Sequence, residues 1–141
     1  MSPLGLKRST VVLGFLAGAL AVPLFHQVML AILYATHFVG RAPFALQPTK
    51  PLGLPAVVSL TFWGGVWGII FAMVSRRRSW TFAVLFGAIL PTVVAWFVVL
   101  PLKGIPPGGG WAPRAVATAL LVNGAWGLGT ALFLRIFSRG R

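Results

Sequence analysis

Four long apolar runs, separated by short basic or proline-rich segments, constrain the fold of this chain more than any other feature of its sequence. The runs cover about residues 10–38, 56–75, 80–100 and 114–136. A helix of about 20 apolar residues can cross the hydrocarbon core of a bilayer, and it satisfies its own backbone hydrogen bonds there. We therefore expect an all-α integral membrane protein, a four-helix bundle that forms a single transmembrane domain over residues 1–141.

The charged residues fit a membrane protein better than a nucleic-acid-binding protein. The chain has 12 Lys and Arg, no Asp or Glu, and a formal net charge of +12. A strongly basic chain often binds DNA or RNA, but here the cations form short clusters between apolar runs, and charged residues make up only 9% of the sequence. We expect membrane lipids, and no nucleic acid, among its partners.

The first apolar run is longer than one crossing requires. We expect tilt or a kink at Pro23 to absorb the excess, because proline removes one backbone hydrogen-bond donor from a helix. A signal peptide is the alternative, since the chain starts with basic residues and carries the small-residue sequence Ala19-Leu20-Ala21. The apolar run continues well past this sequence, which favours a transmembrane helix.

The distribution of Lys and Arg predicts the orientation of the chain in the membrane. If the N-terminus is inside, the inner side carries eight cations, namely Lys7, Arg8, Arg76, Arg77, Arg78, Arg135, Arg139 and Arg141. The outer side then carries four, namely Arg41, Lys50, Lys103 and Arg114. Cytoplasmic loops carry the excess of Lys and Arg, so we expect a bacterial inner-membrane protein with both termini in the cytoplasm. A dual topology would require a closer balance.

The arginine triplet Arg76, Arg77 and Arg78 follows directly after the second apolar run. Basic residues next to a membrane span attract anionic lipid head groups. We expect the triplet to contact such head groups on the cytoplasmic side, and an acidic protein partner is the alternative.

The second and fourth runs share a sequence pattern at an offset of 59 residues. It aligns Gly64-Gly65-Val66-Trp67-Gly68 with Asn123-Gly124-Ala125-Trp126-Gly127, and Ala72 with Ala131. The first and third runs match more loosely, through Gly18-Ala19-Leu20 and Gly87-Ala88-Ile89, with Pro23 and Pro91 shortly after. We predict two tandem hairpins, residues 1–78 and 79–141, related as a parallel internal repeat. Chance similarity between apolar segments is the alternative.

Small residues recur at intervals of four in three of the runs. These residues are Gly14, Gly18, Gly64, Gly68, Ala72, Gly127 and Ala131. Helices in a bilayer associate through close van der Waals packing, and small residues allow their backbones to approach. We expect these faces to pack helices within the chain, and an oligomer interface is the alternative.

Five polar or indole side chains are predicted to lie deep in the membrane. They are His26, Gln27, Trp67, Asn123 and Trp126. Polar groups are costly in hydrocarbon and tend to be functional, although hydrogen bonds between helices also use them. We expect a hydrogen-bonded cluster that holds the helices together, and a small substrate-binding site or polar path is the alternative.

The histidines and the missing residue types limit the possible chemistry. His26 and His37 would lie about 16 Å apart along one helix, too far for a shared metal ion. A dimer that binds haem through histidines of both chains is a remote alternative, and we expect no metal and no cofactor. The chain lacks Asp, Glu and Cys, which supply most acid–base pairs and thiol nucleophiles. We therefore expect no enzyme.

Three segments resemble those of small four-helix bacterial inner-membrane proteins that have no assigned function. They are Phe62-Trp63-Gly64-Gly65-Val66-Trp67-Gly68, Val122-Asn123-Gly124-Ala125-Trp126-Gly127 and Phe25-His26-Gln27. The resemblance covers nearly the whole chain and implies no activity. The chain is also similar in size to small four-helix exporters and fluoride channels, but it lacks the membrane-embedded glutamate of the exporters and has no clear match to the motifs of the channels.

Two functions from different classes follow from these features. The first is a non-catalytic structural or accessory subunit, which packs through its glycine-rich faces against itself or a larger membrane complex. The alternative is a homo-oligomeric channel or carrier for a small neutral or anionic solute. A cation path is disfavoured because the chain contains no acidic residue.

Overall fold

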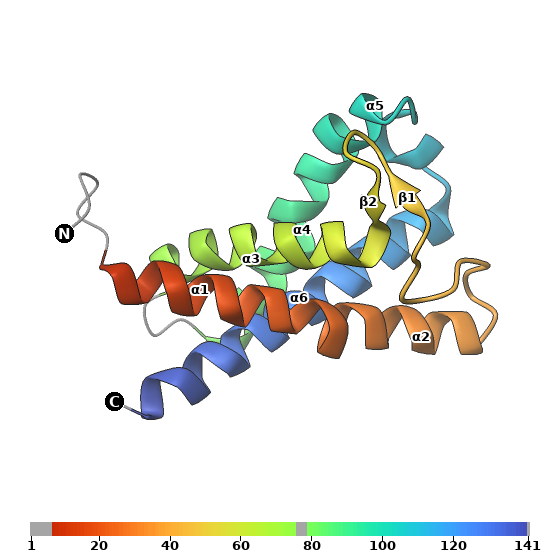
Figure 1. Cartoon of the computed structure of the whole chain (residues 1–141). Coiled ribbons are helices and arrows are strands. Elements are labelled where there is room, and N and C mark those ends of the chain that lie inside the picture. Colours follow the sequence, from red (N-terminus) through yellow and green to blue (C-terminus); the bar gives the residue numbers. More distant parts are fainter. Residues whose placement is uncertain (1–6, 76–78, 141) are drawn as a thin grey trace.

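The computed structural model describes residues 7–75 and 79–140, and helices dominate its regular structure (Figure 1). Four helical spans in these residues are long and apolar enough to cross a membrane: Arg8–Ala35, Ala56–Val74, Trp80–Leu102 and Pro113–Arg139. The predicted helical fold with four apolar helices is confirmed. These spans are those of a multi-pass membrane protein.

The first span contains a π-helical segment at the position of Pro23. It consists of α1 (Arg8–Ala21), the π-helical segment η1 (Val22–His26) and α2 (Gln27–Ala35). The Gln27 N–H donates to the Val22 carbonyl, five residues earlier, which is the π-helical pattern. The wider turn accommodates a residue that has no N–H to donate, and the helix continues beyond it.

The first helix ends three residues earlier than the apolar run predicts. The Thr36 hydroxyl turns back onto the carbonyl oxygens of Ile32 and Leu33, at 2.9 and 3.2 Å. His37 then has a positive φ of 57°, a conformation that L-residues rarely adopt and that ends a right-handed helix. Residues 36–38 therefore belong to the loop, although they continue the apolar sequence.

The third span also contains a π-helical segment, after its internal proline. It consists of α4 (Trp80–Val94), η2 (Ala95–Val99) and α5 (Leu100–Leu102). The Ser79 side chain caps its start by accepting a hydrogen bond from the Phe82 N–H at 3.1 Å. Pro91 lies inside α4 without ending it.

The two long loops meet at one end of the molecule. The first contains a two-stranded antiparallel sheet of β1 (Pro48–Thr49) and β2 (Leu54–Pro55). The second contains a short 3₁₀ helix, η3 (Pro107–Gly110). Lys103 Nζ donates to Thr49 Oγ1 at 2.9 Å, so a side-chain hydrogen bond joins the two loops.

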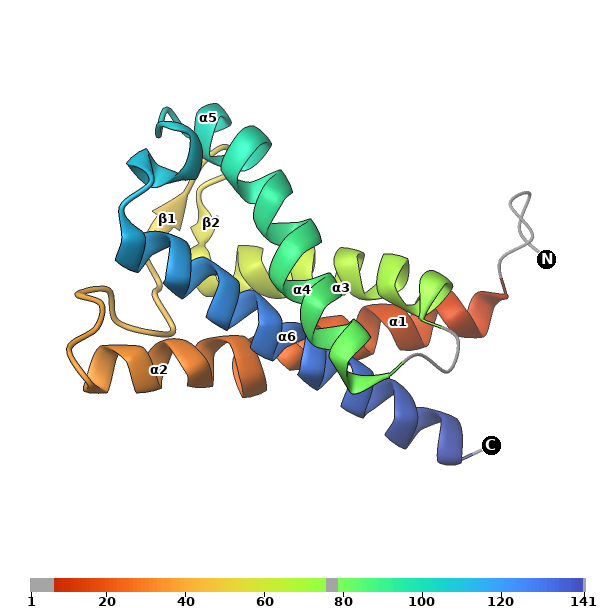
Figure 2. The same ribbon diagram turned by 180° about the vertical axis from the view of Figure 1, so that it is seen from behind.

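The helices pack in the spatial order α3, α1, α6 and α4. Here α3 is Ala56–Val74 and α6 is Pro113–Arg139; α1 packs along α3, α4 along α6, and α1 along α6. The start of α1 and the end of α6 lie at the same end of the molecule, opposite both loops (Figure 1). By contrast, α4 runs obliquely to α3, and its α5 end rises away from α1 and α3 (Figures 1 and 2).

The main core lies where these helices cross. Its buried residues are Ala21, Val22, Phe71, Ala83, Phe86, Trp126 and Ala131. The rings of Phe71 and Phe86, 5.1 Å apart in an edge-to-face arrangement, connect α3 to α4 within this core. A smaller cluster of Leu30, Leu33 and Val122 connects α2 to α6.

Glycines allow α1 and α3 to come into backbone contact. A Cβ atom added at Gly14 would lie 2.8 Å from the Gly68 carbonyl oxygen and 2.9 Å from the Ala72 Cβ. A Cβ added at Gly18 would overlap with the Gly64 carbonyl oxygen. The five small residues expected to pack in this hairpin therefore lie in one helix contact within the chain.

The contact between α4 and α6 is equally close. A Cβ added at Gly87 would overlap with the Asn123 carbonyl oxygen, and one added at Gly127 with the Ala83 carbonyl oxygen. By comparison, a Cβ at Gly124 would lie 3.5 Å from the nearest atom, Val84 Cγ1, which is an ordinary van der Waals distance. Ala131, the other small residue expected to pack here, is buried in the core.

We predict opposite outcomes for Gly127→Ala and Gly124→Ala, two substitutions on the same helix. Gly127→Ala must push α4 and α6 apart, and overpacking of this kind costs about 1–3 kcal/mol. Gly124→Ala places its methyl group in available space and retains stability. Titration of each purified variant with sodium dodecyl sulfate, followed by circular dichroism, measures its unfolding midpoint. Equal unfolding midpoints for the two variants would contradict the close contact at Gly127.

Candidate functional site

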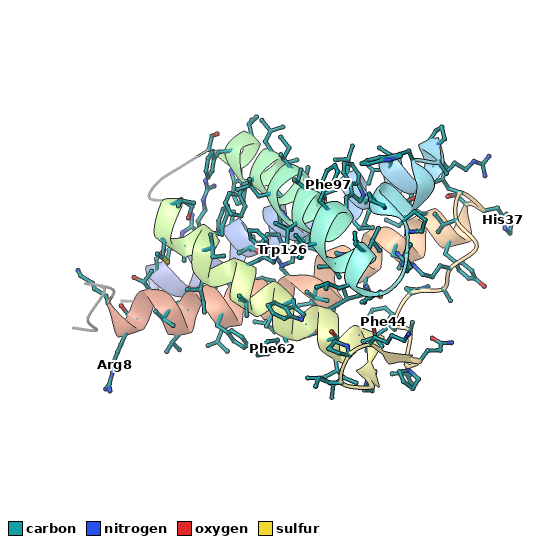
Figure 3. The ribbon with its side chains drawn as sticks, turned by 90° about the horizontal axis from the view of Figure 1, so that it is seen from above. Arg8, His37, Phe44, Phe62, Phe97 and Trp126 are labelled. Atoms are coloured by element: carbon teal, nitrogen blue, oxygen red, sulfur yellow. The ribbon has the colours of Figure 1, made fainter. Side chains whose placement is uncertain are left out.

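Trp126 lies at the centre of the molecule, where three helices meet (Figure 3). Its indole Nε1–H, on α6, donates a hydrogen bond to the Gly18 carbonyl of α1 at 2.9 Å. A Cβ added at Gly64 on α3 would lie 3.2 Å from the same nitrogen. The indole therefore fills the space beside the glycine contact of α1 and α3, and only 3% of Trp126 is exposed.

The Gly18 carbonyl is available to Trp126 because the helix changes its hydrogen bonding before Pro23. In a regular α-helix, the Val22 N–H would donate to Gly18, four residues earlier. Here the Val22 N–H donates to the Ala19 carbonyl instead. The indole of Trp126 takes the place of the missing backbone donor, so one local irregularity specifies where α6 binds α1.

His26 and Gln27 form a second polar group, at the junction of η1 and α2. Both are buried, and Gln27 Nε2 lies 3.0 Å from His26 Nδ1. Gln27 Oε1 accepts a hydrogen bond from the backbone N–H of Phe44 at 2.6 Å. Phe44 belongs to the first loop, where it has a φ of 54°. The hydrogen bond from its N–H therefore holds this loop against the side of the first helical span.

Asn123 forms a third polar group, with a partner that sequence reasoning missed. Its Nδ2 donates to Thr92 Oγ1 on α4 at 2.7 Å, and Thr92 is fully buried. Thr130 is also fully buried, and its hydroxyl donates to the Trp126 carbonyl at 2.9 Å. Isolated threonines inside apolar runs were the available signal, although their hydrogen-bond partners depend on the packing of the helices.

Trp67 occupies the position in α3 that Trp126 occupies in α6, but it makes a different contact. Its ring is half-buried and meets the Phe86 ring edge-to-face, with centroids 6.4 Å apart. The hydrogen bonds of the five residues expected to cluster thus fall into separate groups, around Trp126, around His26 and Gln27, and around Asn123. Among the described residues, every buried side-chain nitrogen or oxygen has a hydrogen-bond partner.

The two histidines do not share a helix face. His26 is buried within the first span, whereas His37 is an exposed loop residue beyond the end of α2. Residues 7–75 and 79–140 contain no group of three side chains of the types that ligate metals. The available donors and acceptors at depth are an imidazole, two carboxamides, indoles and threonine hydroxyls, which suit hydrogen bonding between helices.

A pocket of about 370 Å³ lies at the loop end of the molecule, beside the end of α2 and the start of α6. It is lined by Tyr34, Ala35, His37, Phe38, Val39, Gly40 and Arg114. The Arg114 guanidinium lies over the Phe38 ring, 5.4 Å from its centroid, as expected for a cation–π contact. None of the residues predicted to form the polar cluster lines this pocket.

The basic end of the molecule is described in part. The predicted lipid ligands Arg76, Arg77 and Arg78 lie outside the described residues. The Arg135 guanidinium lies 3.5 Å from the centroid of the Trp80 ring. This contact joins the start of α4 to the end of α6.

Comparison of the chain with protein families, curated proteins and solved structures finds no match.

We predict that Trp126→Phe lowers stability while Trp63→Phe does not. The phenyl ring retains most of the buried apolar surface but leaves the Gly18 carbonyl without the indole donor. Hydrogen bonds between helices in a membrane contribute about 0.6 kcal/mol on average and at most about 1.7, and we expect a loss in this range. Trp63 is 56% exposed, which makes it the matched control in the same detergent titration. A loss for Trp63→Phe as large as for Trp126→Phe would contradict this role of the indole.

Proposed function

We propose that this chain is a non-catalytic structural or accessory subunit of a bacterial inner-membrane complex or homo-oligomer. The observation that carries the proposal is that the polar side chains at membrane depth have partners within the chain. The Trp126 indole, the Gln27 carboxamide and the Asn123 carboxamide each join two segments that are distant in sequence. Such contacts hold helices and a loop in fixed positions, which supports a structural role.

The proposed bundle of two repeated hairpins is supported by matching helix contacts. The first and third spans align at an offset of 69 residues, and the second and fourth at 59. At these offsets, the contacts Gly14–Gly68 and Gly18–Gly64 correspond to Ala83–Gly127 and Gly87–Asn123, all four of which are close backbone contacts. Matching registers in both hairpins are unexpected for unrelated helix pairs. They favour a repeat over a chance similarity of sequence.

The proposed repeat is not symmetric in its contacts between hairpins. α1 packs along α6 through Trp126, whereas the corresponding pair, α3 and α4, diverges toward the loops (Figures 1 and 2). Since the glycine faces are used within the chain, a partner or second copy would contact other faces. Phe62 and Phe97 mark two such faces, on opposite sides of the molecule (Figure 3), and are 52% and 57% exposed.

The position of the pocket supports a subunit over a channel or carrier. A conduit requires a water-accessible space that reaches the polar groups around His26 and Asn123. The pocket described above lies instead beside the end of α2 and the start of α6. His26 and Gln27 are buried, and the half-buried Asn123 is hydrogen-bonded to the buried Thr92.

We predict that Asn123→Leu leaves solute flux unchanged in reconstituted vesicles, while the wild-type chain purifies from native membranes with itself or other proteins. Leucine removes the hydrogen bond to Thr92 but is similar in size to asparagine, so the variant should still assemble. Chemical cross-linking of intact membranes, followed by mass spectrometry, identifies the partners. A wild-type flux of small neutral or anionic solutes that disappears in Asn123→Leu would overturn the subunit proposal and support transport. A cross-linked species of monomer mass only would overturn it as well.

The proposed topology, with both termini in the cytoplasm, can be tested with single cysteines because the natural chain has none. We expect Gln47→Cys and Gly109→Cys to react with a membrane-impermeant maleimide applied to spheroplasts. We expect Ser79→Cys and Ser138→Cys to react only after the membrane is opened. Opposite accessibility of Ser79→Cys and Ser138→Cys would contradict two hairpins of the same orientation.

A further inference from the structure

The pocket beside the end of α2 and the start of α6 combines cationic, polar and apolar groups. Arg114, His37 and Tyr34 supply a guanidinium, an imidazole and a phenol, while Phe38 and Val39 supply apolar walls. Its volume of about 370 Å³ falls at the lower end of the range for ligand pockets. It therefore fits a small polar group with an apolar extension.

Arg114 has no acidic side chain of its own chain to neutralise it. The sequence contains no Asp and no Glu, so no carboxylate side chain in the protein can pair with the guanidinium. The Phe38 ring, whose centroid lies 5.4 Å from the Arg114 guanidinium carbon, carries no charge and does not neutralise it. The guanidinium has five N–H donors in one plane. A planar donor set of this kind matches the oxygens of a phosphate, to which arginine binds in bidentate fashion.

The pocket lies where two of the apolar spans end, the level at which the edge of a membrane is expected. The first apolar span ends at Ala35, and the fourth begins at Pro113, next to Arg114. Tyrosine is enriched at the level of the lipid head groups, and Tyr34 lines the pocket. Phospholipid phosphates are concentrated at this level, and their glycerol and acyl groups would meet the apolar wall.

We propose that this pocket binds a phosphate group, with the phosphodiester of a phospholipid head group as the expected source. Arg114 is the principal ligand, and His37 and Tyr34 form further hydrogen bonds with the head group. The site lies at the opposite end of the molecule from Arg8, since His37 and Arg8 mark opposite ends (Figure 3). The proposal does not depend on whether the chain is a subunit or a conduit.

Titration of the full chain in neutral detergent with dioleoylphosphatidylglycerol, monitored by native mass spectrometry, tests the site. We expect Arg114→Gln to weaken lipid binding at least tenfold, because a hydrogen bond to a charged group contributes about 1.5–3 kcal/mol. Lys50→Gln is the matched control: it removes one cation from the same set of loops, outside the pocket, and should change affinity less than twofold. Dioleoylglycerol, which lacks the phosphate, should not bind.

A second variant tests the pocket without changing its charge. Gly40 lines the pocket, and a Cβ atom added there would meet no atom within 4 Å. The side chain of Gly40→Phe would occupy this space, and we expect it to weaken lipid binding at least tenfold while Arg114 remains. Circular dichroism and gel filtration check that each variant is folded, and if Arg114→Gln is not, Gly40→Phe decides.

Inorganic phosphate distinguishes the two sources of the ligand. If it displaces the lipid from the wild-type chain, the phosphate alone is recognised; if it does not, the glycerol and acyl groups contribute. Either result supports a phosphate site, provided that the effects of Arg114→Gln or Gly40→Phe exceed that of Lys50→Gln. Equal losses of affinity for the folded Arg114→Gln and Lys50→Gln variants would show general attraction to a basic surface, and would overturn the proposal.

Discussion

The arrangement of the helices depends on the hydrogen bond from the Trp126 indole to the Gly18 carbonyl, which joins α6 to α1. The bond requires the α1–α3 glycine contact, because any side chain at Gly18 or Gly64 would displace the indole or separate the helices. It also requires the altered hydrogen bonding before Pro23, which leaves the carbonyl without its usual donor. A bond of about 0.6 kcal/mol cannot by itself hold four helices together. Its effect is to select one position of α6 on α1.

The close glycine contacts add attraction between the helices of each hairpin. Lipid tails are as apolar as leucine, so burial of apolar side chains does not drive helices together in a bilayer. Direct contact between backbones, as at Gly87 and Gly127, brings many atoms within dispersion range. The same glycines therefore explain both the pairing within each hairpin and its sensitivity to a single added methyl group.

Because the chain has no acidic side chain, its polar contacts at membrane depth are made by neutral groups, and two of its arginines contact aromatic rings. Neutral amides, hydroxyls and indoles make the contacts at membrane depth, and aromatic rings face the guanidinium groups of Arg114 and Arg135 near the two ends. Anions that neutralise the net charge of +12 must come chiefly from outside the chain. A membrane surface rich in phosphate supplies them, and for this reason the proposed subunit role and the proposed phosphate pocket are compatible.

The sequence by itself determined the four apolar helices, their approximate ends and the small residues at their contacts. These features depend on hydrophobic length and on residue size, which are local properties of the chain. Only the tertiary structure decided that Trp126 and not Trp67 binds a carbonyl, that Thr92 is the partner of Asn123, and that Gln27 holds the loop at Phe44. It also brought Tyr34, Ala35 and residues 37–40 next to Arg114 in one pocket. Which helix faces meet, and at which height, depends on packing between distant segments, and no local pattern of residues specifies it.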